Sequence, residues 1–264
     1  MASINGKTIW VTGASSGIGR KLVEELNTHT CNLIISSRRE QELLQVKKLC
    51  PNPENIKVLP LDLHEHNQMD ALAQKAIALF GQVDMLVNNA GISQRSLIID
   101  TDFEVYKRLI AIDYLGTVAL SKAILPHFVE NKGGHFITVT SLMGKFGSPY
   151  RSGYCGAKHA LHGFFDVLRM EHEKDNIKVI LVCPGFVQTN VAKNALTGDG
   201  SPQMDDDVAT QNGITAQKAA QQIVKAIEKE QFEVYIGGKE IKGVYLKRFF
   251  PKLLHKVVLR SQVR

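Results

Sequence analysis

Tyr154 and Lys158 lie four residues apart, in a stretch that begins at Ser141. On a helix, this spacing places both side chains on one face. An ammonium group held beside a phenol favours the phenolate, so Tyr154 could give or take a proton at an alcohol or carbonyl oxygen. The hydroxyl of Ser141 could hold the same oxygen in place. Because tyrosine and lysine are both common on helix surfaces, the meaning of this pair depends on the elements that position it.

A second tyrosine, Tyr150, lies four residues before Tyr154. Its own partner one helical turn further on is Tyr154 and not a lysine, so it cannot be activated in the same way. We expect Tyr150 to line the substrate pocket instead.

A glycine-rich turn, Gly13–Gly19, lies between a predicted strand at residues 7–12 and a predicted helix that begins at Arg20. Its spacing is Gly-x-x-x-Gly-x-Gly, and no Gly-Lys-Ser/Thr follows, so it is not a P-loop. Glycines allow a tight turn and a close approach of the backbone to a pyrophosphate, which the helix N-terminus attracts. We therefore predict that this turn binds a dinucleotide, and the alternative is a glycine turn without a ligand.

The second predicted strand, residues 32–37, ends at Ser37 and is followed by Arg38 and Arg39. NAD-binding proteins commonly place an acidic residue at this position, where it binds the ribose 2′-hydroxyl. Here no carboxylate is present to repel a 2′-phosphate, and two guanidinium groups are available to bind one. We therefore expect NADP rather than NAD. The alternative is that the arginines only solvate the start of a helix.

Predicted strands and helices alternate along the chain, which is typical of an α/β fold. We predict further strands at residues 56–61, 84–88, 134–140, 177–183 and 232–236. The alternation predicts a Rossmann-type, doubly wound and mostly parallel sheet with helices on both faces, in a single domain. Ser141 follows the fifth strand, so the candidate site lies at the C-terminal edge of the sheet, where ligands bind in such folds.

We assign residues 1–240 to this catalytic domain. Within it, the polar and turn-rich stretch at about 189–213 interrupts the alternation. A loop this long is usually functional, and because it follows the sixth strand it could close over a substrate.

Residues 241–264 form a tail with seven Lys and Arg and no Asp or Glu, so the formal net charge without the tail falls from +6 to −1. Its apolar residues recur at helical spacing, and most of its basic residues fall off that stripe. The tail is therefore predicted to be a basic amphipathic helix. It could contact an anionic membrane surface peripherally, or pack its stripe on the body or on another subunit, and we slightly favour packing. The near-neutral body argues against nucleic-acid binding.

The composition is ordinary for a globular protein, with 44% hydrophobic and 22% charged residues. We find no run of 18 or more apolar residues and no signal-like pattern at the N-terminus. The four cysteines have no paired spacing and no clustered histidines. We therefore expect reduced thiols, no metal site and a cytoplasmic setting.

Taken in chain order, these motifs resemble those of the short-chain dehydrogenase/reductase family, and the resemblance covers almost the whole chain. It rests on Thr12-Gly13-x-x-x-Gly17-x-Gly19, Asn88-Asn89-Ala90-Gly91, Ser141, Tyr154-x-x-x-Lys158, and Pro184-Gly185 with Thr189. Residues 153–169 and 194–200 look most like the animal "member 7" branch of that family.

The resemblance implies hydride transfer between a nicotinamide and a carbonyl or alcohol carbon, in a homodimer or homotetramer. Tyr154 would be the general acid in reduction and the general base in oxidation. Lys158 would favour the phenolate and bind the nicotinamide ribose, and Ser141 would orient the substrate oxygen.

The resemblance also implies a set of cofactor contacts. Asn89 and Asp62 would contact the adenosine side, although Asp62 could equally cap the next helix. Thr189, with the backbone near Val187, would hold the carboxamide. The whole implied set is Gly13, Ser15, Ser16, Gly17, Ile18, Gly19, Ser37, Arg38, Arg39, Asp62, Leu63, Asn89, Ala90, Gly91, Tyr154, Lys158, Pro184, Gly185, Val187 and Thr189.

Asp113 departs from the family pattern. The family usually has an asparagine in a stretch like Ile-Asn-x-x-Gly-Thr, where it helps to hold a water beside the lysine in a proton relay. Here the stretch is Ile112-Asp113-Tyr-Leu-Gly116-Thr117. A carboxylate near Lys158 would stabilise the ammonium and weaken its effect on Tyr154. We expect the relay to be altered and activity to persist.

The leading prediction is an NADPH-dependent carbonyl reductase, or the reverse dehydrogenase. Apolar residues near the site favour a lipophilic ketone or alcohol such as a steroid, retinoid or acyl compound; they are Leu142, Met143, Phe146 and Phe186. One alternative is a nucleotide-binding regulator that has lost turnover, against which the intact Ser141, Tyr154 and Lys158 argue. Another is a membrane-surface interaction protein that uses the basic tail.

Overall fold

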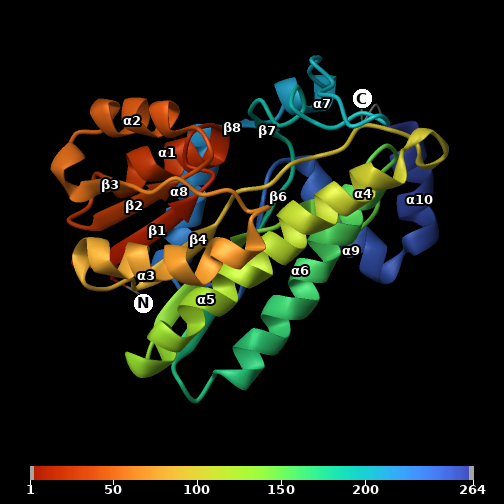
Figure 1. Cartoon of the computed structure of the whole chain (residues 1–264). Coiled ribbons are helices and arrows are strands. Elements are labelled where there is room, and N and C mark those ends of the chain that lie inside the picture. Colours follow the sequence, from red (N-terminus) through yellow and green to blue (C-terminus); the bar gives the residue numbers. More distant parts are fainter. Residues whose placement is uncertain (1–2, 262–264) are drawn as a thin grey trace.

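A seven-stranded parallel sheet forms the centre of the computed structural model, which describes residues 3–261 (Figure 1). The strand order is β3-β2-β1-β4-β5-β6-β9. The bounds are β1 (Thr8–Thr12), β2 (Asn32–Ser36), β3 (Ile56–Val58), β4 (Met85–Asn88), β5 (Gly134–Val139), β6 (Ile177–Pro184) and β9 (Glu233–Ile236). The predicted α/β fold class is confirmed, and the strand order reverses between β1 and β4, which is where such sheets bind ligands.

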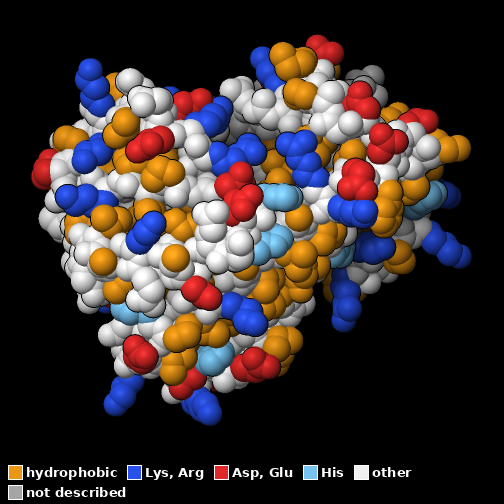
Figure 2. Space-filling model, viewed as in Figure 1, with side chains coloured by type: hydrophobic (Ala, Val, Ile, Leu, Met, Phe, Trp, Pro, Cys, Tyr) orange, Lys and Arg blue, Asp and Glu red, His pale blue; other side chains and the backbone are white. Residues whose placement is uncertain are grey.

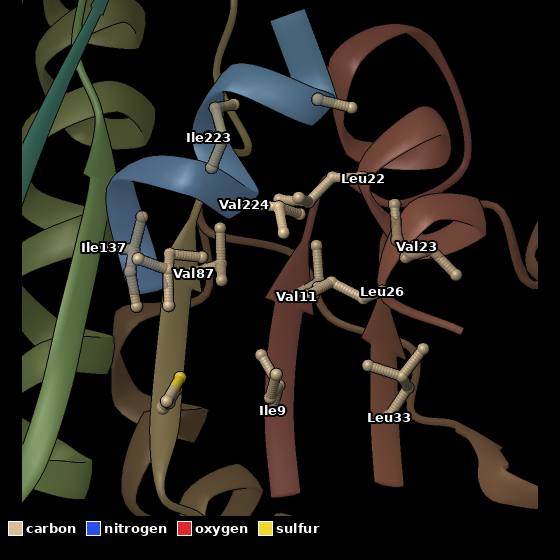
Figure 3. Close-up of a cluster of buried hydrophobic side chains, with 14 of the residues drawn as sticks. Ile9, Val11, Leu22, Val23, Leu26, Leu33, Val87, Ile137, Ile223 and Val224 are labelled. Atoms are coloured by element: carbon tan, nitrogen blue, oxygen red, sulfur yellow. The ribbon is translucent and has the colours of Figure 1, made fainter. Parts of the chain in front are cut away.

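Helices cover both faces of the sheet because each strand is buried on both sides and needs an apolar layer on each. One face carries α1 (Gly17–Leu26), α2 (Glu40–Leu49) and α8 (Ala216–Glu228). Figure 3 shows the core on this side, where Leu22, Val23 and Leu26 of α1 and Val224 of α8 point toward the strands. The other face carries α3 (Met69–Phe80), α5 (Thr117–Glu130) and α6 (Ser152–Glu171).

The long helix over residues 103–130 changes its winding midway. It consists of α4 (Phe103–Leu109), a π-helical segment (Ile110–Gly116) and α5. Its length and apolar composition would allow it to span a membrane. Its inner face, however, buries Leu120, Ile124 and Phe128 against the sheet, so it is a core helix of this fold. The π-helical segment was not predicted; such segments occur frequently at functional sites, and this one contains Asp113.

The substrate loop, residues 189–213, is bracketed by two short strands that the sequence did not predict. β7 (Val187–Gln188) pairs with β8 (Ile214–Thr215), so both ends of the loop leave the body at one place. The loop contains one short helix, α7 (Val208–Gln211), and docks on the body through buried residues that include Leu196 and Asp207.

The tail forms two helices rather than one, α9 (Lys242–Phe249) and α10 (Pro251–Arg260), which are separated at Phe250. Pro251 occupies the first position of α10, where the missing N–H of a proline costs no helical hydrogen bond. Leu254 is buried against a cluster that contains Phe146, whereas Phe249 and Phe250 are exposed. The apolar stripe therefore packs on the body only in part. Residues 262–264 of the predicted tail lie outside the described residues.

Candidate active site

The glycine turn after β1 has a backbone that only glycine adopts easily. Gly13 and Gly17 have φ values of 65° and 55°. A Cβ atom at Gly13 would lie 2.8 Å from the Cα of Ala90, and one at Gly17 would lie 3.1 Å from the Cγ2 of Thr189. The turn is thus in contact with two segments that are remote in sequence, and both were predicted to belong to the site.

Gly19 has a different role from the other two glycines. A Cβ atom there would collide with the carbonyl oxygen of Gly13 and with the side-chain amide of Asn89. Gly19 does not line the cavity described below, and its contact with the cofactor stays a prediction. Its absent side chain allows α1 to pack closely beneath the turn.

Thr12 and Asn89 hold the glycine turn against the turn that follows β4. The Thr12 hydroxyl donates to the carbonyl oxygen of Val87 (3.1 Å) and accepts from the backbone N–H groups of Asn89 (3.0 Å) and Ala90 (3.1 Å). The side-chain amide of Asn89 donates to the carbonyl oxygen of Thr12 (2.9 Å). These bonds fix the relative position of the two turns.

A cavity of about 610 Å³ lies along the C-terminal edge of the sheet, between the glycine turn and α6. This volume is within the usual range for cofactor and small-ligand sites. Apart from Gly19, every predicted cofactor residue lines the cavity, and so does Ser141. These residues are Gly13, Ser15, Ser16, Gly17, Ile18, Ser37, Arg38, Arg39, Asp62, Leu63, Asn89, Ala90, Gly91, Tyr154, Lys158, Pro184, Gly185, Val187 and Thr189.

The N-terminus of α1 faces this cavity. Its N-cap residue, Ser16, makes no side-chain capping hydrogen bond, so the first backbone N–H groups of the helix are available to an anion. Together with the glycine backbone, this arrangement fits the pyrophosphate of a dinucleotide.

Arg39 reaches back across the glycine turn. Its guanidinium donates to the hydroxyl oxygens of Ser15 (3.1 Å) and Ser16 (3.5 Å), and it forms an ion pair with Glu42 (3.0 Å). The Asp62 carboxylate accepts the backbone N–H of His64 (3.0 Å) and also lines the cavity. The next helix, α3, has Gln68 as its N-cap residue, so Asp62 does not cap it, and that alternative is wrong.

Helix α6 carries Tyr154 and Lys158 on one face, as their spacing predicts. The Lys158 Nζ lies 5.6 Å from the centre of the Tyr154 ring and donates to the carbonyl oxygen of Val139 (3.4 Å). Lys158 is buried and Tyr154 is half-buried at the cavity wall. The Ser141 hydroxyl accepts from the backbone N–H of Met143 (3.1 Å) and donates to the carbonyl oxygen of Pro184 (3.3 Å). All three predicted catalytic side chains therefore line one cavity.

Tyr150 does not line this cavity, so its predicted place in the substrate pocket is wrong. It adopts a φ of 67°, a backbone conformation that is uncommon for a residue with a side chain, and its carbonyl oxygen accepts the N–H of Ser96 (3.1 Å). Tyr150 thus belongs to the turn that leads into α6.

Asp113 lies behind Gly91 and beside Lys158. One carboxylate oxygen accepts the backbone N–H of Ile92 (2.8 Å), and the other lies 3.7 Å from the Lys158 Nζ. Burial raises the pKa of Asp113 above its usual value, and the attraction of Lys158 and the hydrogen bond from Ile92 oppose that rise only in part. Asp113 does not line the cavity. Its influence on the chemistry therefore passes through Lys158.

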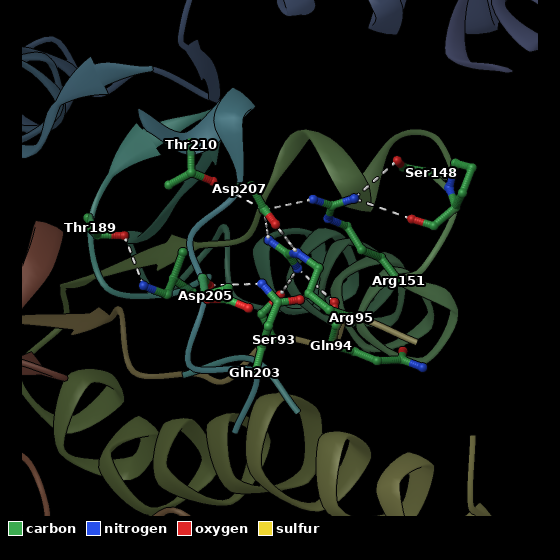
Figure 4. Close-up of polar contacts among 12 residues, drawn as sticks. Ser93, Gln94, Arg95, Ser148, Arg151, Thr189, Gln203, Asp205, Asp207 and Thr210 are labelled. Atoms are coloured by element: carbon green, nitrogen blue, oxygen red, sulfur yellow. Dashed lines mark hydrogen bonds and ion pairs between the residues drawn. The ribbon is translucent and has the colours of Figure 1, made fainter. Parts of the chain in front are cut away.

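Four polar residues near the site were not predicted: Gln94, Arg95, Arg151 and Asp207. They connect the segment after β4, the start of α6 and the substrate loop (Figure 4). No local motif singles out any of them. Only the pairing between distant segments shows that three of them are charged and buried together.

One cluster among the described residues has metal-ligand chemistry. Ligand atoms of His162, Cys183 and Glu233 lie within 4.8 Å of one another. The Lys145 ammonium, however, lies 2.6 Å from one carboxylate oxygen of Glu233, and Tyr235 donates to the other. Burial raises the pKa of the Cys183 thiol to about 12, whereas metal ligation needs the thiolate. These contacts favour a polar network over a metal site.

The four cysteines are free and buried. This agrees with the prediction of reduced thiols rather than a disulfide framework.

Comparison with known proteins identifies the family. Residues 7–199 match the family model for short chain dehydrogenases. The chain is 40% identical over 250 residues to dehydrogenase/reductase SDR family member 7 of Homo sapiens, covering 92% of this chain and 74% of that protein. It is 35% identical over 263 residues to member 7B of Mus musculus, covering 97% of this chain and 81% of that protein.

Two solved structures share the fold. A short-chain dehydrogenase from Streptomyces avermitilis superimposes with a TM-score of 0.80 at 26% identity, covering 96% of this chain and 98% of that one. A short-chain dehydrogenase/reductase from Burkholderia phymatum, solved in complex with NAD, gives a TM-score of 0.84 at 20% identity, covering 100% and 99%. Together with the matches in sequence, these show that the chain belongs to the short-chain dehydrogenase/reductase family, whose enzymes transfer hydride between NAD(P) and an alcohol or carbonyl carbon.

Proposed function

We propose that this protein is an NADP(H)-dependent oxidoreductase that acts on a lipophilic carbonyl or secondary alcohol through Ser141, Tyr154 and Lys158. The observation that carries the proposal is the placement of all three side chains along the cavity that begins at the glycine turn. When bound, the nicotinamide cofactor supplies or accepts the hydride.

The three side chains have different roles in the proton transfer and in binding the substrate oxygen. The Tyr154 hydroxyl gives a proton to the carbonyl oxygen in reduction and removes one from the alcohol in oxidation. Lys158 lies beside the ring of Tyr154 and electrostatically favours the phenolate. Ser141, held between Met143 and Pro184, orients the substrate oxygen.

The preference for NADP is supported by the charges at the adenosine end of the cavity. Arg38 and Arg39 both line it, and Arg39 lies over Ser15 and Ser16. The strand β2 ends without a carboxylate that would repel a 2′-phosphate. A guanidinium is well suited to a phosphate because its N–H groups match the phosphate oxygens in geometry and charge.

The lipophilic substrate is supported by the apolar side chains at the other end of the cavity. Leu142, Met143, Phe146 and Phe186 all line it, as predicted, and Leu196 of the substrate loop lies with them. A steroid, a retinoid or an acyl compound with a ketone or secondary alcohol would bury much of its apolar surface there.

The test is the rate of NADPH oxidation across a panel of such carbonyls, with the matching alcohols and NADP⁺ for the reverse direction. We expect turnover of at least one lipophilic carbonyl, and a lower rate with NADH at the same concentration. Tight NADPH binding without turnover of any member of the panel would favour the alternative, a nucleotide-binding regulator.

A homo-oligomer is supported by an apolar surface on the outer side of the helices, which faces away from the sheet. Leu115 in the π-helical segment and Val167 and Met170 on α6 are exposed, and Figure 2 shows hydrophobic side chains gathered over this face. We propose that two copies pair through it. Sedimentation velocity of a Val167→Glu, Met170→Glu variant should show a smaller species than the unmodified protein; an unchanged sedimentation coefficient would exclude this face.

Peripheral contact with an anionic membrane is supported by the outer face of the tail. Phe249, Phe250, Leu253 and Val257 are exposed there, next to a segment rich in Lys and Arg. Pairing of two copies through this face would bring like charges together, so we propose a lipid surface as its partner. The cytoplasmic setting that we propose, with a peripheral fraction at membranes, is compatible with this contact.

A further inference from the structure

Asp207 of the substrate loop lies between two arginines from other parts of the chain (Figure 4). Arg95 donates to its carboxylate from Nε (2.9 Å) and from Nη2 (2.6 Å), and Arg151 donates to it from Nη2 (3.1 Å). The Asp207 side chain is 0% exposed, and those of Arg95 and Arg151 are 4% and 5% exposed. A buried ionic network therefore helps to hold the loop on the body.

Asp207 neutralises a guanidinium group that is almost completely buried. Arg95 is 4% exposed and donates to the Asp207 carboxylate from two nitrogens. Burial together with the neighbouring Arg95 also lowers the pKa of Arg151 to about 10. If the loop moved away, Arg95 would lose this carboxylate while it stayed buried, which costs free energy. The ion pair therefore favours the docked position of Asp207.

The residue before Arg95 caps the helix that carries the proposed catalytic tyrosine. The side-chain oxygen of Gln94 accepts the backbone N–H of Gly153 (2.7 Å) and that of Tyr154 (3.4 Å). Its amide nitrogen donates to the hydroxyl of Ser96 (3.1 Å), and Gln94 is completely buried. Arg151 is the N-cap residue of α6, so Gln94 and Arg151 both lie at the start of this helix.

The backbone of the same segment pairs with the substrate loop. Arg95 N–H donates to the carbonyl oxygen of Leu196 (2.8 Å), and Leu196 N–H donates to that of Ser93 (2.8 Å). The segment Ser93–Arg95 therefore contacts the loop through its backbone and through Arg95, and contacts the first turn of α6 through Gln94.

We propose that Gln94 and Arg95 are positioning residues that couple docking of the substrate loop, through Asp207, to the placement of Tyr154 at the start of α6. The pocket would close and the acid–base group would reach its working position in one step. The catalytic part of this inference rests on the proposed role of Tyr154, whereas the structural coupling can be measured without activity.

The test is hydrogen exchange with mass spectrometry on the full chain, followed in peptides that cover residues 150–158 and 203–212. Asp207→Asn removes the charge and keeps the shape. We expect faster exchange in both peptides, although Tyr154 itself is unchanged. Asp205→Asn, the same substitution at an exposed position of the same loop, should leave both peptides as in the unmodified protein. Faster exchange of 203–212 alone would overturn the coupling.

A second variant approaches the coupling from the other side and keeps the test decisive if Asp207→Asn folds poorly. Gln94→Met removes the cap of α6 and no charge. Because coupling is reciprocal, it should raise exchange in the loop peptide as well as in the helix peptide. An effect confined to the helix would contradict the proposal.

A double variant separates this network from a general loss of stability. Arg95→Gln removes the other partner of the same ion pair, so combining it with Asp207→Asn should lower the protection of both peptides by less than the sum of the two single effects. If the two substitutions only add their effects, the shared network does not exist.

Kinetics then test the catalytic part. Asp207→Asn should lower kcat/KM by about 10- to 100-fold with a fall in kcat, since a small misplacement of a reacting group has effects of that size. The dissociation constant for NADPH should stay within about twofold. Coupled exchange with an unchanged kcat would refute the role of Tyr154 and leave the structural coupling intact. A rise in KM alone, without coupled exchange, would show that Asp207 only holds the loop.

Discussion

Arg39 is the side chain on which the proposed preference for NADP can be tested most directly. Arg39→Ala removes the guanidinium that lies over Ser15 and Ser16. A charge-assisted hydrogen bond contributes about 1.5–3 kcal/mol, so NADPH affinity should fall by about 10- to 100-fold while NADH affinity changes little. Fluorescence titration with both cofactors measures this, with Lys48→Ala on the same helix as the control. An equal loss for both cofactors would show that Arg39 only supports the turn.

The effect of Asp113 on the free energy of unfolding depends on pH. Its pKa is raised in the folded state, so the folded protein binds this proton more tightly than the unfolded chain. The carboxyl group therefore costs no stability below its ordinary pKa of about 3.9, and costs progressively more as pH rises through the folded value. The Tm of Asp113→Asn minus that of the unmodified protein should therefore be larger at pH 8 than at pH 4.5.

The contrary result for this variant is a Tm difference that does not change with pH. That would mean that Lys158, 3.7 Å away, fully offsets the burial of the carboxylate. The rate of alcohol oxidation by Asp113→Asn, compared with that of the unmodified protein, gives the functional side of the same substitution.

Local spacing predicted some of these residues and could not predict others. Tyr154 and Lys158 are one helical turn apart, so their contact follows from the helix alone. Arg95 and Asp207 are 112 positions apart, and no local pattern relates them. Arg39 was predicted by its place at a strand end, whereas its contact with Ser15 depends on how the glycine turn folds back over β2.

Among the contacts between elements, the ion pair of Lys145 with Glu233 connects the turn after Ser141 to the edge strand β9. Lys145 contacts Glu233 at 2.6 Å, and Glu233 also interacts with His162 and Tyr235. Burial alone would raise the pKa of Glu233, but these three partners lower it to about 2. The carboxylate therefore adds stability above about pH 4.3, and this contribution is lost as pH falls toward 2.

Lys145→Met tests how much this ion pair contributes to the free energy of unfolding. Both side chains are partly exposed, so we expect a loss of about 1 kcal/mol in the free energy of unfolding at pH 7. In urea titrations the deficit should shrink as pH falls below about 4.3, where Glu233 begins to take up its proton in the unfolded chain. A deficit that is the same at pH 7 and pH 3 would mean that Lys145 acts through packing of its alkyl chain.

The seven strands of the main sheet were predictable because each is a short, mostly apolar run that ends in a turn. Their order in the sheet was not predicted. The π-helical segment was not predicted, because residue periodicity does not reveal it. Its last residue, Gly116, lies close against the backbone of Leu63, a contact between segments that are distant in sequence. The strands β7 and β8 escaped prediction for a similar reason. Each has only two residues, and they pair across the whole substrate loop.

At the scale of the molecule, the cavity and the outer face of the tail lie close to each other. Val258 of α10 lines the cavity, while Phe249 and Phe250 point away from the body as exposed side chains. A lipophilic substrate dissolved in a membrane would therefore meet the protein near the cavity. The sequence predicted the amphipathic pattern but not its division into an inner and an outer face, since that depends on the surface against which α10 packs.

Vesicle flotation tests the membrane contact with the full chain. The unmodified protein should float with vesicles that contain phosphatidylserine and much less with phosphatidylcholine alone, because Lys and Arg near a surface each contribute about 1 kcal/mol of attraction to anionic lipid. Phe249→Ser, Phe250→Ser should lose most of this binding, whereas Phe103→Ser, an exposed phenylalanine on α4, should not. Equal binding by all three proteins would exclude the tail as the contact.

We propose that Tyr154 transfers the proton in a reaction whose hydride comes from or goes to NADP(H). The most direct test is Tyr154→Phe, which removes one hydroxyl oxygen and keeps the ring beside Lys158. With the best carbonyl substrate of the panel, kcat should fall by about 10²- to 10⁴-fold, while the dissociation constant for NADPH stays close to that of the unmodified protein. A variant that binds NADPH normally and keeps the full rate of carbonyl reduction would contradict the proposed role of Tyr154 in proton transfer.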